Sequence, residues 1–553
     1  MVAIALTGCG LGKMIKKYGE VKYTVDPPIL EVHADKVPVK ISATVPAKYF
    51  IKGASATFTP VLKWEGGEVS LKPITVLGET AQGDGQKIKN ASGGSFSYTD
   101  TIPYKPAMKK SELFAKVGLA MKSKTADLPE RKLTVGCITT STRVANDEDI
   151  RLGADKYVKE SIISQEAEIY YPIQSAVIPQ KEMTGGSMKT LKEFVAKKYI
   201  TKNITITAWA SPDGPVELND KLSGDRSTSA FKYVQNELVK MKLDGAKNEE
   251  LYSKVSKGEY WDGFNKLVGA SNIEDRQLIL DIVNRHSDVN SREQEIKNLA
   301  VVYLTLAKDI LPKLRKADIA INSQEPKKTD AQIDSLSLAK PDSLDVEELL
   351  YAATLSQDLD KQLKIYESAS NVYPDDWRGY NNVGYIYLKQ GKLDEAKSWL
   401  EKAKAKNATA EVLSNLGVAA AWSQDYEGAI KNFEEAKSGG GNVSNNLGIL
   451  NLRTGNYTTA LEYFGSDCSY NAALSNLLLK NNDAAKTKSE CAAKTAATAY
   501  LQAIIGARMG DAGMMSSSLK AAVGQDANYR REAMDDLEFS KFWENTDFKG
   551  AIQ

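Results

Sequence analysis

The chain has 553 residues, too many for a single hydrophobic core, so three or four domains are expected. Its 72 Lys and Arg residues nearly balance its 71 Asp and Glu residues, and a net charge of +1 gives no reason to expect nucleic-acid binding. The two histidines, His33 and His286, lie far apart, which argues against a histidine metal cluster or general base. No nucleophile–base pair, phosphate loop or C-x-x-C motif is present, so we expect no enzymatic activity, cofactor or metal.

The first residues read MVAIALTGC, and Leu6-Thr7-Gly8-Cys9 resembles the lipobox of bacterial lipoproteins. The resemblance implies that Cys9 carries lipid and that residues 1–20 are a signal remnant and tether. No Lys or Arg precedes the motif to form a positive n-region, which suggests a start codon assigned too late or a trimmed chain. A short buried strand is the alternative. Acyl chains would attach the protein to the membrane, because no stretch approaches the roughly 18 apolar residues of a membrane helix.

Residues 21–155 show short strand patterns separated by turns. Apolar residues alternate with polar or small ones at Val37, Val39, Ile41, Ala43 and Val45, as in a strand with one buried face. Residues 64–68 indicate a hairpin turn between strands at 58–63 and 69–76, residues 90–97 a loop, and residues 133–139 another strand. This spacing predicts an N-terminal all-β sandwich, for which we expect a role in spacing or protein contact.

A strand, a polar loop and a helix follow one another from Ile204 to Arg226. Residues 204–209 alternate with a period of two, and residues 211–214 are turn formers. Leu218, Leu222 and Arg226 then fall on one helical face. Such an arrangement places backbone N–H groups and loop side chains around a small pocket.

This stretch resembles the OmpA C-terminal-like domain, an α+β module that docks Gram-negative outer-membrane proteins onto peptidoglycan. The shared signature is G-x4-N-x2-L-S-x2-R. The resemblance implies that Arg226 holds the carboxylate of diaminopimelate in the stem peptide. The family's aspartate, which grips the ammonium group, is replaced by Ser211, and Asp213 could supply that charge. The implied peptidoglycan-binding residues are Ser211, Asp213, Gly214, Asn219, Ser223 and Arg226. The alternative is that Arg226 only braces the helix against the loop.

The resemblance covers about residues 160–322. It implies a first strand near 168–171, helices at 188–198 and 216–238, and a closing strand at 316–321. A polar, helical insertion at 241–309 departs from the family and is expected to cover one side of the pocket. Residues 323–345 contain two prolines and few periodic apolar residues, and we predict a flexible linker there.

Residues 346–545 carry an internal repeat that resembles the tetratricopeptide repeat (TPR). The template positions are filled by Tyr380, Val383, Gly384, Tyr387, Ala396, Leu400 and Ala403, and copies follow 33 and then 31 residues later around Gly417 and Gly448. The resemblance implies an all-α solenoid with a concave groove suited to a peptide or helix of a protein partner. First-helix positions give the groove residues Asn382, Tyr385, Lys389, Asn415 and Arg453. The alternative is that the asparagines merely pack between repeats.

Two functions remain open from the sequence. The first is an outer-membrane lipoprotein facing the periplasm, a scaffold that contacts peptidoglycan and recruits a protein through its repeats. The second is a periplasmic subunit of an outer-membrane assembly or secretion complex, whose OmpA-like domain is an interface without peptidoglycan binding. Ser211 favours the second, and Asn219, Ser223 and Arg226 favour the first. Cys468 and Cys491 could pair in an oxidising periplasm, although buried free cysteine is commoner for such spacing.

Overall fold

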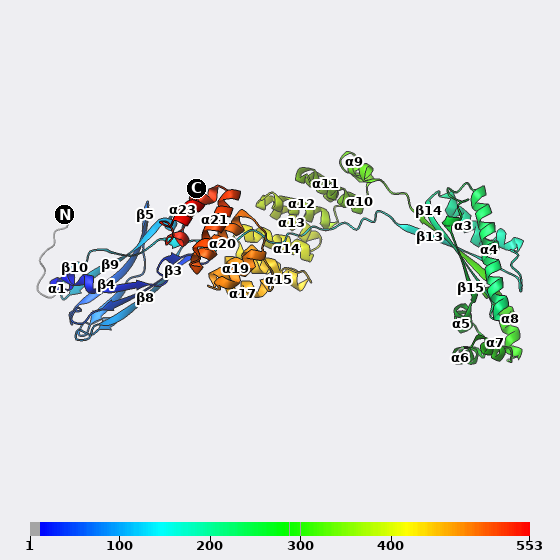
Figure 1. The fold of residues 1–553 in the computed structure, drawn as a ribbon, viewed down its shortest axis with the longest axis horizontal. Helices are drawn as coiled ribbons and strands as arrows, with labels where there is room; N and C mark the ends of the chain where they lie inside the picture. The colour runs from blue at the N-terminus through cyan, green and yellow to red at the C-terminus, as the bar shows by residue number, and fades with distance from the viewer. Residues whose placement is uncertain (1–10, 287, 299) are drawn as a thin grey trace. The chain divides into compact units, whose positions relative to one another are not determined.

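The computed structural model describes residues 11–286, 288–298 and 300–553, and these residues form two compact units (Figure 1). One unit combines the residues up to 154 with residues 356–553, and the other comprises residues 155–355. The lipidation motif at Cys9 lies outside the described residues. Within the described part of the chain, no helix is both long and apolar enough to cross a membrane.

The first unit begins with a sandwich of two β-sheets. One sheet has the antiparallel order β1-β3-β8, with β1 at Lys22–Val25, β3 at Lys36–Val45 and β8 at Gly94–Pro103. The other sheet has the order β10-β9-β4-β6-β7, with β11 also paired to β9 and β5 to β4. Its strands are β4 (Ser55–Trp64), β5 (Gly67–Ser70), β6 (Ile74–Gly78), β7 (Gln86–Ile88), β9 (Ser111–Met121), β10 (Lys124–Asp127) and β11 (Arg131–Val135).

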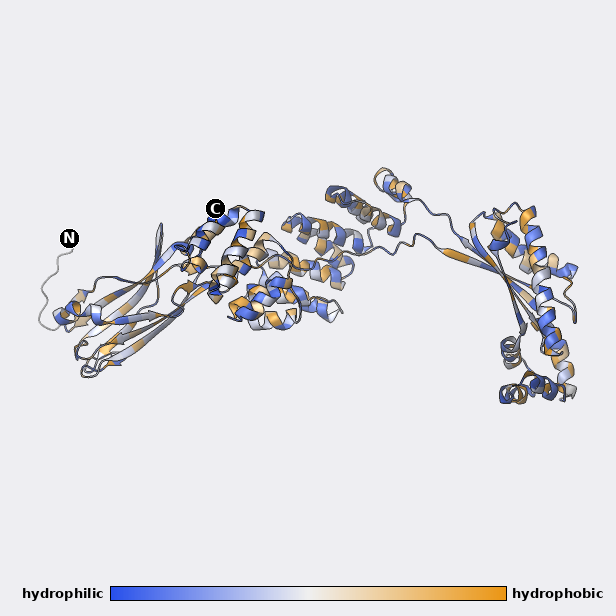
Figure 2. Cartoon of the chain, viewed as in Figure 1, coloured by the Kyte–Doolittle hydropathy of each residue, from blue (hydrophilic) through white to orange (hydrophobic). Residues whose placement is uncertain are grey.

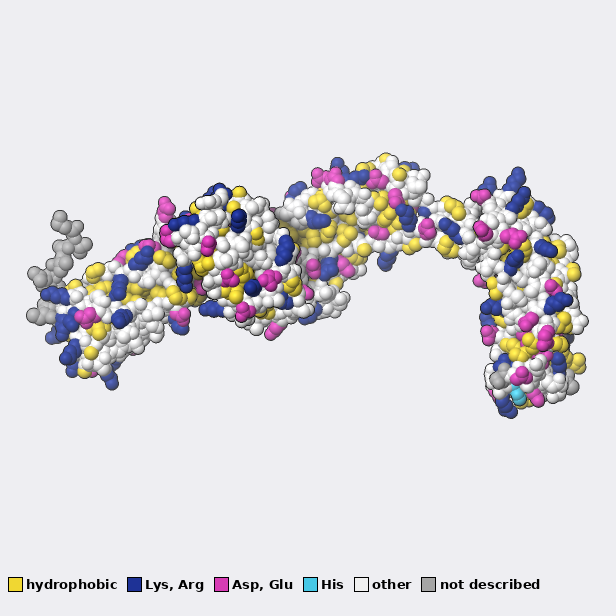
Figure 3. All heavy atoms as spheres, viewed as in Figure 1, with side chains coloured by type: hydrophobic (Ala, Val, Ile, Leu, Met, Phe, Trp, Pro, Cys, Tyr) yellow, Lys and Arg dark blue, Asp and Glu magenta, His cyan; other side chains and the backbone are white. Residues whose placement is uncertain are grey.

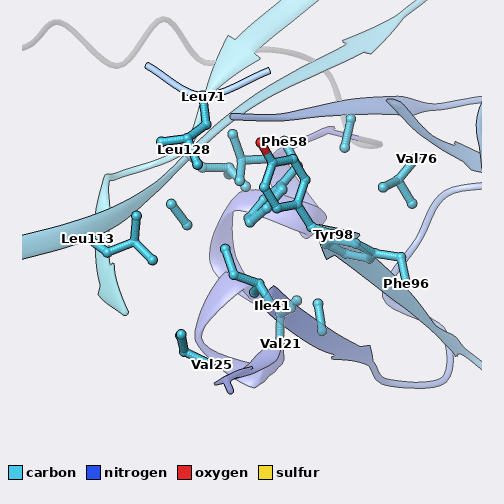
Figure 4. Close-up of a cluster of buried hydrophobic side chains, with 14 of the residues drawn as sticks. Val21, Val25, Ile41, Phe58, Leu71, Val76, Phe96, Tyr98, Leu113 and Leu128 are labelled. Carbon is cyan, nitrogen blue, oxygen red and sulfur yellow. The ribbon is translucent and has the colours of Figure 1, made fainter. Parts of the chain in front are cut away.

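The sandwich core forms because apolar residues alternate along the facing strands (Figure 2). The ring of Phe58 on β4 lies 5.3 Å from that of Phe96 and 5.8 Å from that of Tyr98, both on β8 (Figure 4). These aromatic contacts place the two sheets face to face. The hairpin predicted at residues 64–68 is present, and Gly66 takes the positive φ of 83° that the turn requires. The loop predicted at residues 90–97 is shorter than expected. β8 already begins at Gly94, because Phe96 is buried in this core.

Short elements surround the sandwich and lead out of it. They are α1 (Leu11–Lys16), η1 (Tyr18–Glu20), β2 (Leu30–Glu31), η2 (Pro106–Lys110), β12 (Cys137–Ile138) and η3 (Thr140–Thr142). The strand predicted at residues 133–139 is divided into β11 and β12. From residue 143 to residue 161 the chain forms neither a helix nor a strand. Its backbone groups therefore need hydrogen-bond partners in other parts of the molecule.

The helical repeats complete the first unit. They are α11 (Leu359–Val372), α12 (Trp377–Lys389), α13 (Leu393–Lys406), α14 (Ala410–Trp422), α15 (Tyr426–Ser438), α16 (Ser444–Arg453), α17 (Tyr457–Phe464), α18 (Tyr470–Leu478), α19 (Asn482–Cys491), α20 (Ala496–Met509), α21 (Ala512–Gln525), α22 (Asn528–Asp535) and α23 (Thr546–Ala551), with η7 (Leu537–Phe539) between the last two. A Cβ at Gly384 would lie 2.6 Å from Leu400, and one at Gly417 would lie 2.4 Å from Phe433. The small residues of the repeat template therefore allow the close packing of paired helices.

The second unit is built on a four-stranded sheet with the order β13-β16-β14-β15. The strands are β13 (Ile162–Tyr170), β14 (Ile200–Ala210), β15 (Tyr252–Glu259) and β16 (Lys316–Gln324). Only β14 and β15 are parallel, and α4 (Val216–Lys240) connects them. α3 (Gly186–Ala196) and α4 share a core with one sheet face, which buries Ile204, Ile206 and Ile319. α2 (Gln180–Met183) precedes α3.

The inserted region is only partly helical as predicted. It contains η4 (Glu249–Leu251) and the strand β15, followed by α5 (Trp261–Gly269), α6 (Arg276–Arg285), α7 (Val289–Asn298), α8 (Ala300–Asp309) and η5 (Leu311–Leu314). β15 was not predicted, because only its two ends are buried and its sequence lacks an apolar alternation. The helices have their own core, which includes Phe264, Val268 and Ile279.

The flexible linker predicted at residues 323–345 is wrong. Residues up to Gln324 belong to β16, and α9 (Asp330–Ala339), η6 (Pro341–Ser343) and α10 (Val346–Thr354) follow. α9 begins with a capping box, in which Thr329 and Gln332 satisfy each other's backbone N–H groups. The helix buries Ile333, and its Asp330 accepts hydrogen bonds from Lys159 at 2.7 Å and from Tyr351 at 3.2 Å. The polar composition therefore forms a capped, packed helix.

Candidate functional site

The six residues of the predicted peptidoglycan site are divided between two neighbouring elements: Ser211, Asp213 and Gly214 lie in the loop between β14 and α4, and Asn219, Ser223 and Arg226 lie on α4. Arg226 is 1% exposed, and its guanidinium donates to the carbonyls of Ser175 at 3.0 Å, Trp209 at 2.9 Å and Pro172 at 3.3 Å. The Tyr171 ring lies 5.3 Å from it. Burial lowers the pKa of Arg226 to about 10, against the opposing effect of Tyr171. The side chain therefore links the segment that follows β13 to the end of β14.

Asp213 is held by an arginine that the sequence did not single out. Arg315, just before β16, donates to the Asp213 carboxylate at 3.1 Å and to the Ser211 hydroxyl at 3.0 Å. Ser211 in turn donates to Asp213 at 2.5 Å. Both charged side chains are about one-tenth exposed, so this is a closed ion pair inside the fold. The ammonium-binding charge implied for Asp213 is thus already neutralised by Arg315.

The remaining signature residues join α4 to β15. Asn219 donates to the carbonyl of Gly214 at 2.9 Å and to the carboxylate of Glu259 at 2.7 Å. Ser223 shares a 2.5 Å hydrogen bond with Ser256 and accepts the N–H of Gly258 at 3.1 Å. These contacts fix the loop through other residues of the same unit. They agree with the alternative in which Arg226 only braces the helix against the loop.

A second set of polar residues lines the repeats and faces the extended segment 143–153. In an extended chain, alternate residues present their backbone groups to the same side. Asn415 on α14 accepts the N–H of Arg151 at 2.7 Å and donates to its carbonyl at 2.6 Å. Asn382 on α12 does the same for Gly153, at 2.7 Å and 2.9 Å. Each asparagine thus satisfies both backbone groups of one segment residue.

Two further asparagines extend this pattern, which we name the asparagine ladder: Asn382, Asn415, Asn446 and Asn471. Asn446 on α16 pairs with Asp149 at 2.6 Å and 3.0 Å, and Asn471 on α18 pairs with Ala145 at 3.0 Å and 3.1 Å. All four asparagines are at most 1% exposed. Because these asparagines contact only backbone groups of the segment, the ladder recognises an extended chain without reading its side chains.

The side chain of Glu148 in the segment is recognised specifically. The carboxylate of Glu148 is fully buried, and it accepts hydrogen bonds from the Trp422 indole at 2.7 Å and from Arg453 at 3.1 Å. Arg453 also donates to Asn146 at 2.7 Å. A buried carboxylate is tolerated only when it is paired and hydrogen-bonded, and Glu148 meets both conditions. The Glu148 pocket therefore fixes the register of the segment.

The ends of the segment are also anchored in the repeats. Arg143 donates to Glu532 at 2.7 Å and to Asp536 at 2.9 Å, and its guanidinium lies 4.4 Å from the Tyr500 ring. At the other end, a Cβ on Gly153 would lie 2.9 Å from Arg378, so only glycine fits without a shift. The segment is therefore held along its length.

Comparisons with known proteins support part of this description. Residues 379–407 match the model of a tetratricopeptide repeat. This match spans α12 and α13, so the surface of the repeats that contacts segment 143–153, called the groove below, includes a tetratricopeptide repeat. No curated protein matches the chain. Among solved structures, it is similar to the APC/C hetero-tetramer Cut9–Hcn1, with 14% identity over 62% of this chain and 77% of that one and a TM-score of 0.33. It is also similar to PilW, a widely conserved type IV pilus biogenesis factor, with 15% identity over 40% of this chain and 89% of that one and a TM-score of 0.24. These two likenesses are too distant to bear on function.

The predicted residues of the tetratricopeptide groove divide into two sets. Asn382, Asn415 and Arg453 contact the segment, whereas Lys389 lies 5.2 Å above the ring of Tyr385, one turn away on α12. Sequence reasoning missed Asn446, Asn471 and Glu148. Asn446 was available from the template, since Asn382, Asn415 and Asn446 each precede the repeat glycine by two residues.

The cysteines of the tetratricopeptide region are paired. Cys468 and Cys491 form a disulfide with a Cα–Cα distance of 5.6 Å, and both are exposed, so the expectation of buried free thiols is wrong for this pair. Cys137 is free and buried, and burial raises the pKa of its thiol to about 11. In the described residues, no cluster of three or more His, Cys, Asp or Glu side chains could hold a metal ion.

Proposed function

We propose that the protein is a non-enzymatic scaffold of the Gram-negative cell envelope, a subunit of an outer-membrane assembly. Its tetratricopeptide repeats act in protein–protein contact, and part of their recognition surface holds the chain's own N-terminal part. The asparagine ladder carries this proposal, because it is a complete backbone-recognition site occupied by segment 143–153. Such a site makes the sandwich and the repeats one body that can present surfaces to other subunits.

The proposed location in the cell envelope rests on two features. The lipobox resemblance at Cys9 supports anchoring in the outer membrane, with the folded units facing the periplasm. The exposed disulfide between Cys468 and Cys491 supports an oxidising compartment, since such bonds are rare where thiols are kept reduced. The mixture of acidic and basic side chains on the surface that Figure 3 shows agrees with a protein contact surface and not a nucleic-acid one.

For residues 155–355 we favour an OmpA-like domain that serves as an interface and not as a stem-peptide receptor. The signature residues support the resemblance. The internal use of Arg226 by three carbonyls and of Asp213 by Arg315 supports the loss of ligand binding. A diaminopimelate group would have to displace both sets of contacts at once.

Sedimentation with purified peptidoglycan sacculi tests the second unit. We expect the wild-type protein to remain in the supernatant, and a Ser211→Asp variant, which restores the family's aspartate, serves as the matched comparison. Wild-type binding that free diaminopimelate competes away would contradict the interface proposal and favour the peptidoglycan scaffold instead.

Membrane fractionation tests the anchor. With a full signal peptide, Cys9→Ala should leave the membrane fraction, whereas Cys137→Ala, which removes a buried thiol elsewhere, should stay in it. Retention of Cys9→Ala in membranes after a high-salt wash would show that lipid on Cys9 is not the attachment.

A further inference from the structure

We propose that the tetratricopeptide groove is also a docking site for a second copy of this chain, which supplies its own segment 143–153 in place of the resident one. This inference rests on the proposed scaffold function and adds the identity of one partner. The exchange would join the N-terminal part of one copy to the repeats of the next.

The topology makes the exchange possible without new contacts. The first unit consists of two parts that are not consecutive, because the chain leaves it after residue 154 and returns at residue 356. The parts meet through the ladder, through Arg143 with Glu532 and Asp536, and through a 2.9 Å hydrogen bond between His33 and Tyr457. Every one of these contacts can form equally between two copies, which is the condition for exchanging an identical element.

The chemistry makes the site selective for this partner. The ladder accepts any extended backbone, but the groove also requires a glutamate that reaches Arg453 and Trp422 and, five residues later, a glycine beside Arg378. Val144 and Ile150 pack against the hydrophobic cores of the repeats. A second copy presents this whole pattern in the correct register. Within one chain the two parts have a high effective concentration, so exchange is expected at high protein concentration or during assembly.

A charge-swap experiment on the full chain tests the proposal. Glu148→Arg places a cation against Arg453, and Arg453→Glu places a carboxylate against Glu148, so each variant alone loses its internal contact. When the two are mixed, each groove meets a complementary segment, and we expect a 1:1 complex by light scattering. The double variant Glu148→Arg/Arg453→Glu is the control, and it should remain a monomer like the wild type.

A labelled synthetic peptide with the sequence of residues 143–153 gives an independent arm. It should bind the full-length Glu148→Arg variant, whose groove is open, and bind Arg453→Glu about thirty-fold or more weakly. Should Glu148→Arg fail to fold by circular dichroism, Gly153→Val provides a second way to expel the segment without a charge change. Peptide binding without a mixed complex would overturn the second-copy proposal, and no peptide binding by either opened variant would show that the groove cannot be exchanged. Neither result depends on sacculus or membrane binding.

Discussion

The loop from Ser211 to Arg226 and the groove of the repeats are both rich in buried polar side chains, yet those side chains have different partners. In the loop, Arg226 reaches carbonyls only 17 to 54 residues away, and Asp213 pairs with Arg315 of the same sheet unit. In the groove, Asn415 and Asn471 reach backbone groups 264 and 326 residues away, on a segment outside any helix or strand. Partners from the helices, strands and loops of one sheet unit complete its fold, whereas an irregular segment from a distant part of the chain occupies a recognition surface. The following changes test that distinction.

The largest effect is expected at Arg226. Arg226→Ala removes a buried donor from the carbonyls of Ser175 and Trp209, whereas the Pro172 carbonyl keeps the N–H of Ser175. At about 1–3 kcal/mol for each group that loses its donor, the second unit should lose about 2–6 kcal/mol of unfolding free energy. Thermal unfolding with a probe in this unit measures the loss, and Lys221→Ala, an exposed change on the same helix, is the control. An Arg226→Ala protein as stable as wild type would mean that the guanidinium is free for a ligand.

In the groove, the largest effect is expected at Glu148. Glu148→Ala leaves Arg453 without its buried carboxylate and Trp422 without an acceptor, which should destabilise the attachment of segment 143–153 by about 2–4 kcal/mol. Limited proteolysis should then cut within the segment, while the neighbouring exposed change Asp149→Ala keeps its backbone contacts with Asn446 and stays resistant. Equal resistance of the two variants would contradict a register-fixing role for Glu148.

A single rung of the ladder should have a smaller effect. Asn415→Ala leaves the N–H of Arg151 without its acceptor, whereas the Arg151 carbonyl keeps the hydrogen bond from Asn381 at 3.1 Å. We expect a loss of about 1–3 kcal/mol of unfolding free energy. Denaturant unfolding of the first unit measures it, with the exposed Asn407→Ala as the control. If Asn415→Ala costs no more than Asn407→Ala, the asparagines only pack between repeats.

The smallest effect is a pH dependence of the second unit. Burial, together with Glu259, raises the pKa of Glu293 to about 7 from its ordinary value of 4.5. The folded state therefore holds a proton that the unfolded state releases, and stability should fall as the pH rises from about 4.5 to about 7. Thermal unfolding between pH 5 and pH 8 should show this fall in wild type and in the exposed control Glu295→Gln, and a reduced fall in Glu293→Gln. An unchanged slope in Glu293→Gln would assign the dependence to another group.

Periodic apolar patterns and the two family resemblances together predicted much of the fold. β3, β16 and α4 lie within a few residues of their predicted positions, and the repeat glycines mark real close approaches, as Gly417 beside Phe433 shows. The polar elements could not be predicted from apolar periodicity. The sequence around the Thr329 capping box has the polar composition of a linker, and β15 lacks an apolar alternation.

The sequence predicted the repeat side of the candidate site but not the segment that lies against it. The repeat template identified Asn382 and Asn415 as groove residues, but no local pattern reveals that residues 143–153 lie against them, because this pairing spans more than 200 residues and uses backbone groups common to every sequence. Likewise, Arg315 lies 102 residues from Asp213, and the OmpA-like signature gives no sign of that ion pair.

Amide hydrogen exchange resolved to single residues tests most directly whether segment 143–153 occupies the groove. The ladder accepts the N–H groups of Ala145, Asp149, Arg151 and Gly153, so these amides should exchange far more slowly than those of Asn146, Ile150 and Leu152 between them. Asn415→Ala should accelerate exchange most strongly at Arg151. Fast and uniform exchange along the whole segment in the wild-type protein would contradict the account.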